Sequence, residues 1–154
     1  MQEKIYFSKI RDVKSPTRGT KESAGIDFYI PNDWPVNEWK TFTLLPHEDI
    51  LIPSGIKVNM PKGHALIAYN KSGVVTKKKL LVGACVVDSD YQNEIHLHLV
   101  NTGQLPQMLS AGDKIIQFIL TPINFAEIEE VKEPELYLEI TERGLGGFGS
   151  TGND

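Results

Sequence analysis

The chain has 154 residues, of which 40% are hydrophobic and 23% charged, and this composition excludes a disordered or fibrous protein. The length predicts one domain with its own core, and 16 basic against 20 acidic residues argue against a nucleic-acid-binding surface. The single cysteine, Cys85, excludes an internal disulfide and any zinc site built on two thiolates.

The elements expected along the chain are short strands. Thirteen glycines and nine prolines separate runs rich in Ile, Val, Leu, Phe and Tyr, a pattern typical of an all-β sandwich or barrel. The expected strands are, in chain order, Lys4–Ile10, Ala24–Ile30, Glu48–Ile52, Ile56–Met60, His64–Tyr69, Leu80–Val87, Glu94–Val100 and Lys114–Leu120. No apolar run approaches the roughly 20 residues of a membrane span, and the first residues lack a signal-peptide core. We therefore expect no membrane contact and a cytoplasmic location, in the host cytoplasm if the chain is phage-encoded.

The strand Glu94–Val100 has the clearest pattern. Its apolar residues alternate with His96 and His98, which predicts one buried face and places both histidines on the polar face. We read the two histidines as surface or channel residues because no third metal ligand follows nearby. The one expected helix is Ser72–Lys79, with Ser72 as a plausible N-cap.

Two segments differ from the strands. Asn32–Lys40 carries both tryptophans in a proline-broken stretch, which predicts a surface excursion packed back by its aromatic rings. The last stretch, 143–154, contains five glycines and few apolar residues, so it cannot form a core of its own. We expect a β-rich domain over 1–142 and a C-terminal lid over 143–154 that is flexible until ligand binds.

The residue types in this lid favour binding of a nucleotide polyphosphate. Glycines allow successive N–H groups to converge on an anion, and Ser150 and Thr151 add hydroxyl donors. Arg143 supplies a planar fork suited to phosphate oxygens, and Phe148 offers a flat face for a base.

This tail resembles the fifth motif of the trimeric dUTP diphosphatases, over Arg143–Gly152 without a break. The other four family motifs resemble segments that follow one another in order, at Ala24–Asp27, Lys71–Gly73, Gly83–Tyr91 and Gly112–Gln117. The resemblance implies a jelly-roll-like β fold and a homotrimer whose active sites draw motifs from all three chains. It also implies magnesium-assisted attack of water on the α-phosphorus of dUTP. The products would be dUMP and diphosphate, which lowers dUTP and supplies dUMP for thymidylate synthesis.

The resemblance assigns a role to each matching residue. Asp88 would orient the attacking water as a general base. Asp27 would support magnesium hydration, or hold a neighbouring arginine or the nucleophile's surroundings. Tyr91 would pack under the deoxyribose and exclude ribonucleotides. The magnesium ion would be held by substrate phosphates and water rather than by protein ligands. The expected substrate-binding residues are Lys71, Ser72, Gly73, Val82, Gly83, Ala84, Cys85, Val87, Tyr91, Gln117, Arg143, Phe148, Gly149, Ser150 and Thr151.

The chain departs from the family pattern at several positions. Lys71 and Lys114 stand where the family has arginine, which keeps the charge and loses bidentate geometry. Cys85 replaces a hairpin glycine near the expected uracil site, and Asn93 replaces the glycine after the tyrosine. These changes bear on rate and substrate range.

Two other functions fit parts of the sequence. A dCTP deaminase of the same fold needs a glutamate to manage protons at the cytosine amino group, and Glu94 is the acidic residue in that neighbourhood. A nucleotide-dependent signalling protein would use tail ordering as its switch, with the Trp34–Trp39 excursion as its surface. Ammonia release from dCTP tests the first, and deletion of Asn32–Lys40 tests the second.

Overall fold

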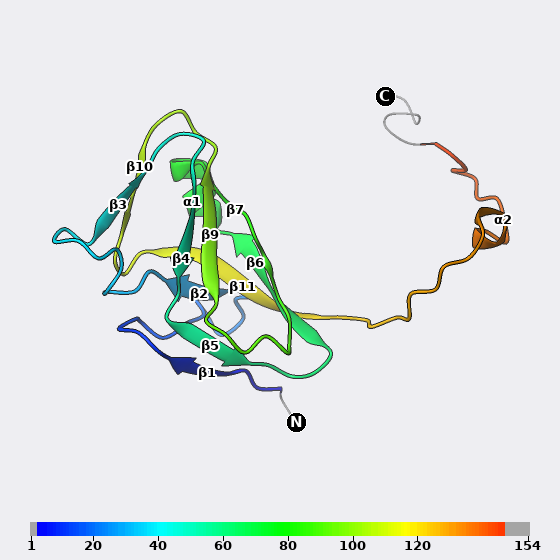
Figure 1. The fold of residues 1–154 in the computed structure, drawn as a ribbon, viewed down its shortest axis with the longest axis horizontal. Helices are drawn as coiled ribbons and strands as arrows, with labels where there is room; N and C mark the ends of the chain where they lie inside the picture. The colour runs from blue at the N-terminus through cyan, green and yellow to red at the C-terminus, as the bar shows by residue number, and fades with distance from the viewer. Residues whose placement is uncertain (1–2, 147–154) are drawn as a thin grey trace. The chain divides into compact units, whose positions relative to one another are not determined.

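The computed structural model describes residues 3–146, which form two units, 3–124 and 125–146 (Figure 1). The described elements are, in chain order, β1 (Tyr6–Lys9), β2 (Ile26–Tyr29), β3 (Thr41–Leu44), β4 (Asp49–Pro53), β5 (Ile56–Asn59), β6 (His64–Asn70), α1 (Ser72–Lys78), β7 (Leu80–Val82), β8 (Val86–Val87), β9 (His96–Asn101), β10 (Gln107–Ser110), β11 (Lys114–Pro122) and α2 (Glu133–Leu136). Within these residues no helix is long and apolar enough to cross a membrane.

The strands of the first unit form four small sheets, ordered β1–β5, β10–β3, β2–β11–β6–β8 and β4–β9–β7. Every neighbouring pair in them is antiparallel. The all-β prediction is confirmed. The helix α1 was expected, whereas the single turn of α2, with a proline in its first turn, was not.

The core lies between these sheets. Ile95, Leu97 and Leu99 are fully buried, while His96 is exposed and His98 is half-buried, as the alternation in this strand predicts. Phe28 of β2 and Phe118 of β11 lie in the same core, with ring centroids 4.6 Å apart. The buried residues of β9 therefore belong to the same close-packed core as the aromatic rings of β2 and β11.

The expected strand Leu80–Val87 is two strands in two sheets. β7 pairs with β9, and β8 pairs with β6, so the chain changes sheets at residues 83–85. A Cβ atom on Gly83 would overlap the His98 ring, so glycine is required where the chain crosses. We call this connection the 83–85 hairpin, although the strands on its two sides pair with different neighbours.

The helix start and two strands differ from expectation. Lys71 is the N-cap of α1, and it makes no side-chain capping bond, so the N-cap prediction for Ser72 was wrong. The sequence analysis missed strands β3 and β10, which pair only with each other. Leu44 lies opposite Gln107, and Thr41 lies opposite Ser110. A pairing so distant in the chain leaves little local signal.

Candidate functional site

The 83–85 hairpin and the turn after β8 surround a pocket of about 300 Å³. The lining residues are Leu51, Ala84, Cys85, Val86, Val87, Asp88, Tyr91, Ile95, His96 and Phe118. Five of them are site residues expected from the sequence, and Val82 and Gly83 directly precede them in the chain. The third motif therefore folds into one concave surface.

The hairpin has both bonded and free main-chain groups. The Gly83 N–H donates to the His98 carbonyl over 3.0 Å, and the Ala68 N–H donates to the Cys85 carbonyl over 2.7 Å. Within residues 3–146 the Cys85 N–H and the carbonyls of Gly83 and Ala84 make no hydrogen bond. One donor and two acceptors are thus left beside the pocket for a polar ligand.

Asp88 and Tyr91 lie in the turn that follows β8. The Tyr91 N–H donates to the Asp88 carbonyl over 3.2 Å, which closes the turn. The Asp88 side chain is exposed, and Val86 in the strand before it is 59% exposed. The Asp88 carboxylate therefore faces solvent in a single chain, at the edge of the pocket.

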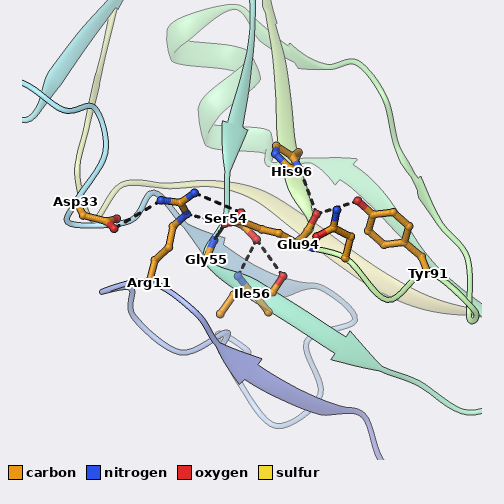
Figure 2. A network of polar contacts seen from close by, with 9 residues as sticks. Arg11, Asp33, Ser54, Gly55, Ile56, Tyr91, Glu94 and His96 are labelled. Atoms are coloured by element: carbon orange, nitrogen blue, oxygen red, sulfur yellow. Dashed lines mark hydrogen bonds and ion pairs between the residues drawn. The ribbon is translucent and has the colours of Figure 1, made fainter.

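The Tyr91 ring is held by a polar network that centres on Glu94 (Figure 2). The Tyr91 hydroxyl donates to the Glu94 carbonyl oxygen over 3.0 Å. The buried Glu94 carboxylate accepts hydrogen bonds from Arg11 Nε at 2.8 Å and from the Gly55 N–H at 2.7 Å. Burial alone would raise the pKa of Glu94, but the hydrogen bonds from Arg11 and Gly55 outweigh it and lower this pKa overall.

The same network bears on the deaminase alternative. A glutamate that shuttles protons at a cytosine amino group needs a free carboxylate with a raised pKa. Glu94 is instead ion-paired, and its pKa is lowered, so it is poorly suited to that work. Its contacts fit a structural role beneath Tyr91.

A second group of predicted residues gathers around Asp27 on β2. The Asp27 side chain is buried and forms ion pairs with Lys71 Nζ and with Lys114 Nζ, the latter at 3.2 Å. The two lysines that replace family arginines thus converge on one carboxylate. The partners of Asp27 are thus two lysines, whereas an arginine was among its expected partners.

Gln117 on β11 lies opposite Asp27 on β2. A Cβ atom on Gly25 would overlap the Gln117 amide, so glycine at that position makes room for the side chain. The Gln117 Nε2 donates to the Asn70 carbonyl over 2.8 Å, and the Asn70 Oδ1 accepts from the Val82 N–H over 2.8 Å. Asn70, which sequence reasoning missed, therefore links the Asp27 group to the strand that leads into the hairpin.

Ser72 and Gly73 form the exposed first turn of α1, directly after Lys71. Neither they nor the Asp27 group line the 300 Å³ pocket. The single chain thus brings the predicted residues into two groups, which Asn70 joins.

The structure describes only the first residues of the predicted lid. Arg143 belongs to the second unit, where its Nε donates to the Gly146 carbonyl over 3.1 Å and Gly144 adopts a φ of 49°. The positive φ shows why glycine follows the arginine. Phe148, Gly149, Ser150 and Thr151 lie outside the described residues.

Two residues of β9 make contacts that the sequence did not indicate. His98 contacts the 83–85 hairpin through Ala84, and buried Asn101 binds the carbonyls of Leu44 and Leu105. The alternation of β9 placed His98 on a face without identifying its neighbours. In the 32–40 excursion, Trp34 packs against Phe42 with ring centroids 6.0 Å apart, but Trp39 is 78% exposed, so only one tryptophan packs back as expected.

Comparison with known proteins identifies the family to which the chain is similar. Residues 11–152 match the family model described as dUTPase. The chain is 36% identical over 151 residues to the human mitochondrial deoxyuridine 5'-triphosphate nucleotidohydrolase, covering 97% of this chain and 55% of that protein. It is 37% identical over 147 residues to the cowpox virus enzyme of the same name, covering 96% of this chain and 91% of that one.

Solved structures share the fold. A variant of the dUTPase of Staphylococcus bacteriophage 80alpha, solved with dUpNHpp, superposes with a TM-score of 0.81 at 21% identity, covering 97% of this chain and 98% of that one. A variant of the dUTPase from phage phi11 of S. aureus, whose structure concerns a structural Mg(II) ion, gives a TM-score of 0.72 at 20% identity, covering 84% of this chain and 97% of that one.

Proposed function

The chain belongs to the dUTPase family, the family of dUTP nucleotidohydrolases, and we propose that it hydrolyses dUTP to dUMP and diphosphate at the pocket beside the 83–85 hairpin. The observation that carries this proposal is the gathering of Ala84, Cys85, Val87, Asp88 and Tyr91 around one cavity. This activity would lower dUTP and supply dUMP for thymidylate synthesis.

Base recognition rests on the free main-chain groups of the hairpin. Uracil presents an N–H donor between two carbonyl acceptors, whereas cytosine presents an acceptor nitrogen and an amino donor. The free Cys85 N–H can donate to one carbonyl of uracil, and a free carbonyl of Gly83 or Ala84 can accept the uracil ring N–H. Cytosine presents an acceptor nitrogen where uracil presents its ring N–H, so the main-chain carbonyl at that position would face a like group, which lowers the affinity for cytosine. Val82 and Gly83 place this segment.

Chemistry rests on Asp88. Its exposed carboxylate at the pocket edge accepts a proton from a water molecule as the water oxygen attacks the α-phosphorus. The bond from the α-phosphorus to the bridging oxygen breaks, and diphosphate leaves. Tyr91, held by its hydrogen bond to the Glu94 carbonyl, excludes a ribose 2′-hydroxyl.

Phosphate binding is assigned to the second group. Lys71, Ser72, Gly73 and Gln117 supply an ammonium, a hydroxyl, main-chain N–H groups and an amide, all suited to phosphate oxygens. Asp27 fixes the Lys71 ammonium and so positions it rather than binding substrate itself. These residues would act on a nucleotide whose base lies in the hairpin.

Magnesium fits this donor set as an ion that arrives with the substrate. Mg²⁺ prefers oxygen ligands and keeps several waters, and substrate phosphates supply such ligands. Among residues 3–146 no group of three His, Cys, Asp or Glu side chains is placed to hold a metal, and Asp27 is occupied by two lysines. The ion would neutralise phosphate charge, while Asp88 remains available for the water.

The homotrimer and the lid complete the site. The pocket and the Asp27 group are separate in one chain, so neighbouring subunits would bring a pocket and a phosphate-binding group together. The lid, residues 143–154, would bind the terminal phosphates through Arg143, Ser150, Thr151 and Gly149, and would cover the base with Phe148. Closure excludes water and strengthens the charge contacts.

The proposal is tested by diphosphate release from dUTP, dCTP, dTTP and UTP, each with magnesium and with a chelator. We expect turnover of dUTP that depends on magnesium, and little turnover of the other three. Equal turnover of UTP and dUTP would contradict the assigned role of Tyr91. Ammonia release from dCTP would replace the proposal with the deaminase alternative.

A further inference from the structure

Arg11 joins segments that are far apart in the chain (Figure 2). Its Nε donates to Glu94 Oε1 over 2.8 Å, and its Nη1 lies 3.7 Å from Asp33 Oδ2 in the 32–40 excursion. Its aliphatic stem covers Gly55 so closely that a Cβ atom added there would lie 2.9 Å from the Arg11 Cβ atom. The guanidinium therefore holds Glu94, and the stem holds the connection between β4 and β5.

Glu94 links this cluster to the pocket. Its Oε1 accepts the Gly55 N–H over 2.7 Å in addition to the bond from Arg11, so the carboxylate is fixed from two sides. Its main-chain carbonyl oxygen accepts the Tyr91 hydroxyl over 3.0 Å, and His96 Nδ1 lies 3.0 Å from the same oxygen. One residue thus binds Arg11 through its side chain and Tyr91 through its main chain.

Two routes lead from Arg11 to the peptide unit between Glu94 and Ile95. The first is the Glu94 side chain. The second is the connection that the Arg11 stem covers, because Ile56, the first residue of β5, accepts the Ile95 N–H at its carbonyl over 2.9 Å. This peptide unit carries the oxygen that binds the Tyr91 hydroxyl. Arg11 therefore supports the anchor of the Tyr91 ring by both routes.

The Tyr91 ring depends on this anchor. The residue is 40% exposed, and its main-chain N–H donates to the Asp88 carbonyl over 3.2 Å. Among residues 3–146 the side chain makes one hydrogen bond, which is the bond to the Glu94 carbonyl. Without it, the ring could tilt about its side-chain torsions and would no longer define the width of the pocket that it lines.

We propose that Arg11 is a positioning residue for sugar selection: by holding Glu94, it fixes the Tyr91 ring that excludes a ribose 2′-hydroxyl. The inference rests on the proposed function, because it concerns how the same site rejects a ribonucleotide. Arg11 does not line the pocket, so it acts through Glu94 and Tyr91 rather than on the nucleotide.

The substitution Arg11→Met tests this role, because methionine keeps an apolar stem over Gly55 but removes the donors and the charge. The Glu94 side chain, which is 11% exposed, then keeps the Gly55 N–H as its hydrogen-bond partner and moves toward water. We expect the ratio of kcat/KM for dUTP to that for UTP to fall about fivefold to tenfold, with kcat for dUTP within about twofold. The fall should come from better use of UTP.

Arg11→Gln is the conservative variant. Its Nε2 takes the position of the arginine Nε and can still donate to Glu94 Oε1, so the ratio should stay within about twofold of the wild type. The matched control is Arg18→Met, since the Arg18 guanidinium donates to the Ser23 and Ala24 carbonyls, both over 2.6 Å, and makes no bond to this network among residues 3–146. Any loss in this control should fall on dUTP and UTP alike and leave the ratio unchanged.

A double-mutant cycle with Tyr91→Phe tests the route. Phenylalanine lacks the hydroxyl, so Tyr91→Phe alone should lower the ratio about as much as Arg11→Met, and combining the two should lower it little further. An unchanged ratio in Arg11→Met, an equal fall in Arg18→Met, or losses that multiply in the double variant would overturn the proposal. An unchanged ratio in Tyr91→Phe would overturn it even if Arg11→Met did not fold.

These outcomes differ from a failure of the proposed function. A wild-type protein that does not hydrolyse dUTP, or that hydrolyses UTP equally well, would overturn the proposed function. A wild-type protein that prefers dUTP, with a ratio that Arg11→Met leaves unchanged, overturns this inference alone.

Discussion

Replacing Glu94 with glutamine should destabilise the protein in a way that depends on pH. The Glu94 side chain is 11% exposed, and its carboxylate accepts bonds from Arg11 Nε at 2.8 Å, Arg11 Nη2 at 3.4 Å and the Gly55 N–H at 2.7 Å. A glutamine oxygen at the position of Oε1 keeps the bonds from the Gly55 N–H and from Arg11 Nε. The amide N–H₂ at the position of Oε2 cannot accept from Arg11 Nη2, and the neutral side chain has no charge to pair with the Arg11 guanidinium.

The expected loss comes from the Arg11 contact. Hydrogen bonds to charged groups contribute about 1.5–3 kcal/mol each, but solvent screening lowers the value for exposed partners. The Arg11 side chain is 36% exposed, so we assign the pair about 2 kcal/mol in total. For a chain of this length, that corresponds to a fall in Tm of about 4–8 °C.

The sign of the pH dependence follows from the lowered pKa of Glu94 in the folded protein. The unfolded carboxyl titrates near 4.5, so its stabilisation is fully present above that pH and is lost as pH falls through the folded pKa. The wild type should therefore exceed Glu94→Gln in stability at pH 7.5, and the difference should shrink below about pH 4.5.

The assay is thermal or urea unfolding of both proteins, followed by circular dichroism at matched concentration from pH 7.5 to pH 3.5. Glu38→Gln is a suitable control, because Glu38 is exposed and makes no ion pair among the described residues. A wild-type advantage that stays constant over this range, or one below about 0.5 kcal/mol at pH 7.5, would refute the argument.

Three more perturbations test other parts of the site. Asp88→Asn should bind dUMP normally and lower turnover by about 10²–10⁴, and near-normal turnover would show that Asp88 does not activate water. Asp27→Asn leaves Lys71 and Lys114 without their carboxylate, so it should lower the free energy of unfolding by about 2–3 kcal/mol. A midpoint of urea unfolding equal to that of the wild type would contradict this role of the ion pairs. Removing residues 143–154 should leave a trimer, seen by light scattering, that binds dUMP but turns over dUTP poorly. Phe148→Ala should show a milder defect from about 1–3 kcal/mol of lost stacking, and equal turnover of the truncated and full-length proteins would remove the lid from the account.

The sequence was informative where structure is local. The period-two alternation of residues 95–99 identified the buried face of β9, and glycine and proline spacing identified most strands. The third motif resembled a nucleotide-binding hairpin, and its residues do line one pocket. These features depend on neighbours a few positions apart.

The features that sequence reasoning missed depend on contacts between distant segments. The pairing of β3 with β10 joins strands that are far apart in the chain. The ion pairs of Lys71 and Lys114 with Asp27 join three strands or strand ends, so two apparently independent departures from the family pattern share one partner. Alternation identified the face on which His98 lies, but only the sheet topology shows that β7 brings the hairpin to this ring.

The central claim is that water attacks the α-phosphorus of dUTP in the pocket that Asp88 borders. It is tested most directly by single-turnover hydrolysis of dUTP in oxygen-18 water, with mass spectrometry of both products. The account predicts one labelled oxygen in dUMP, none in diphosphate, and a greatly slowed appearance of the same label in Asp88→Asn. Label in the diphosphate would place the attack on another phosphorus and contradict the account.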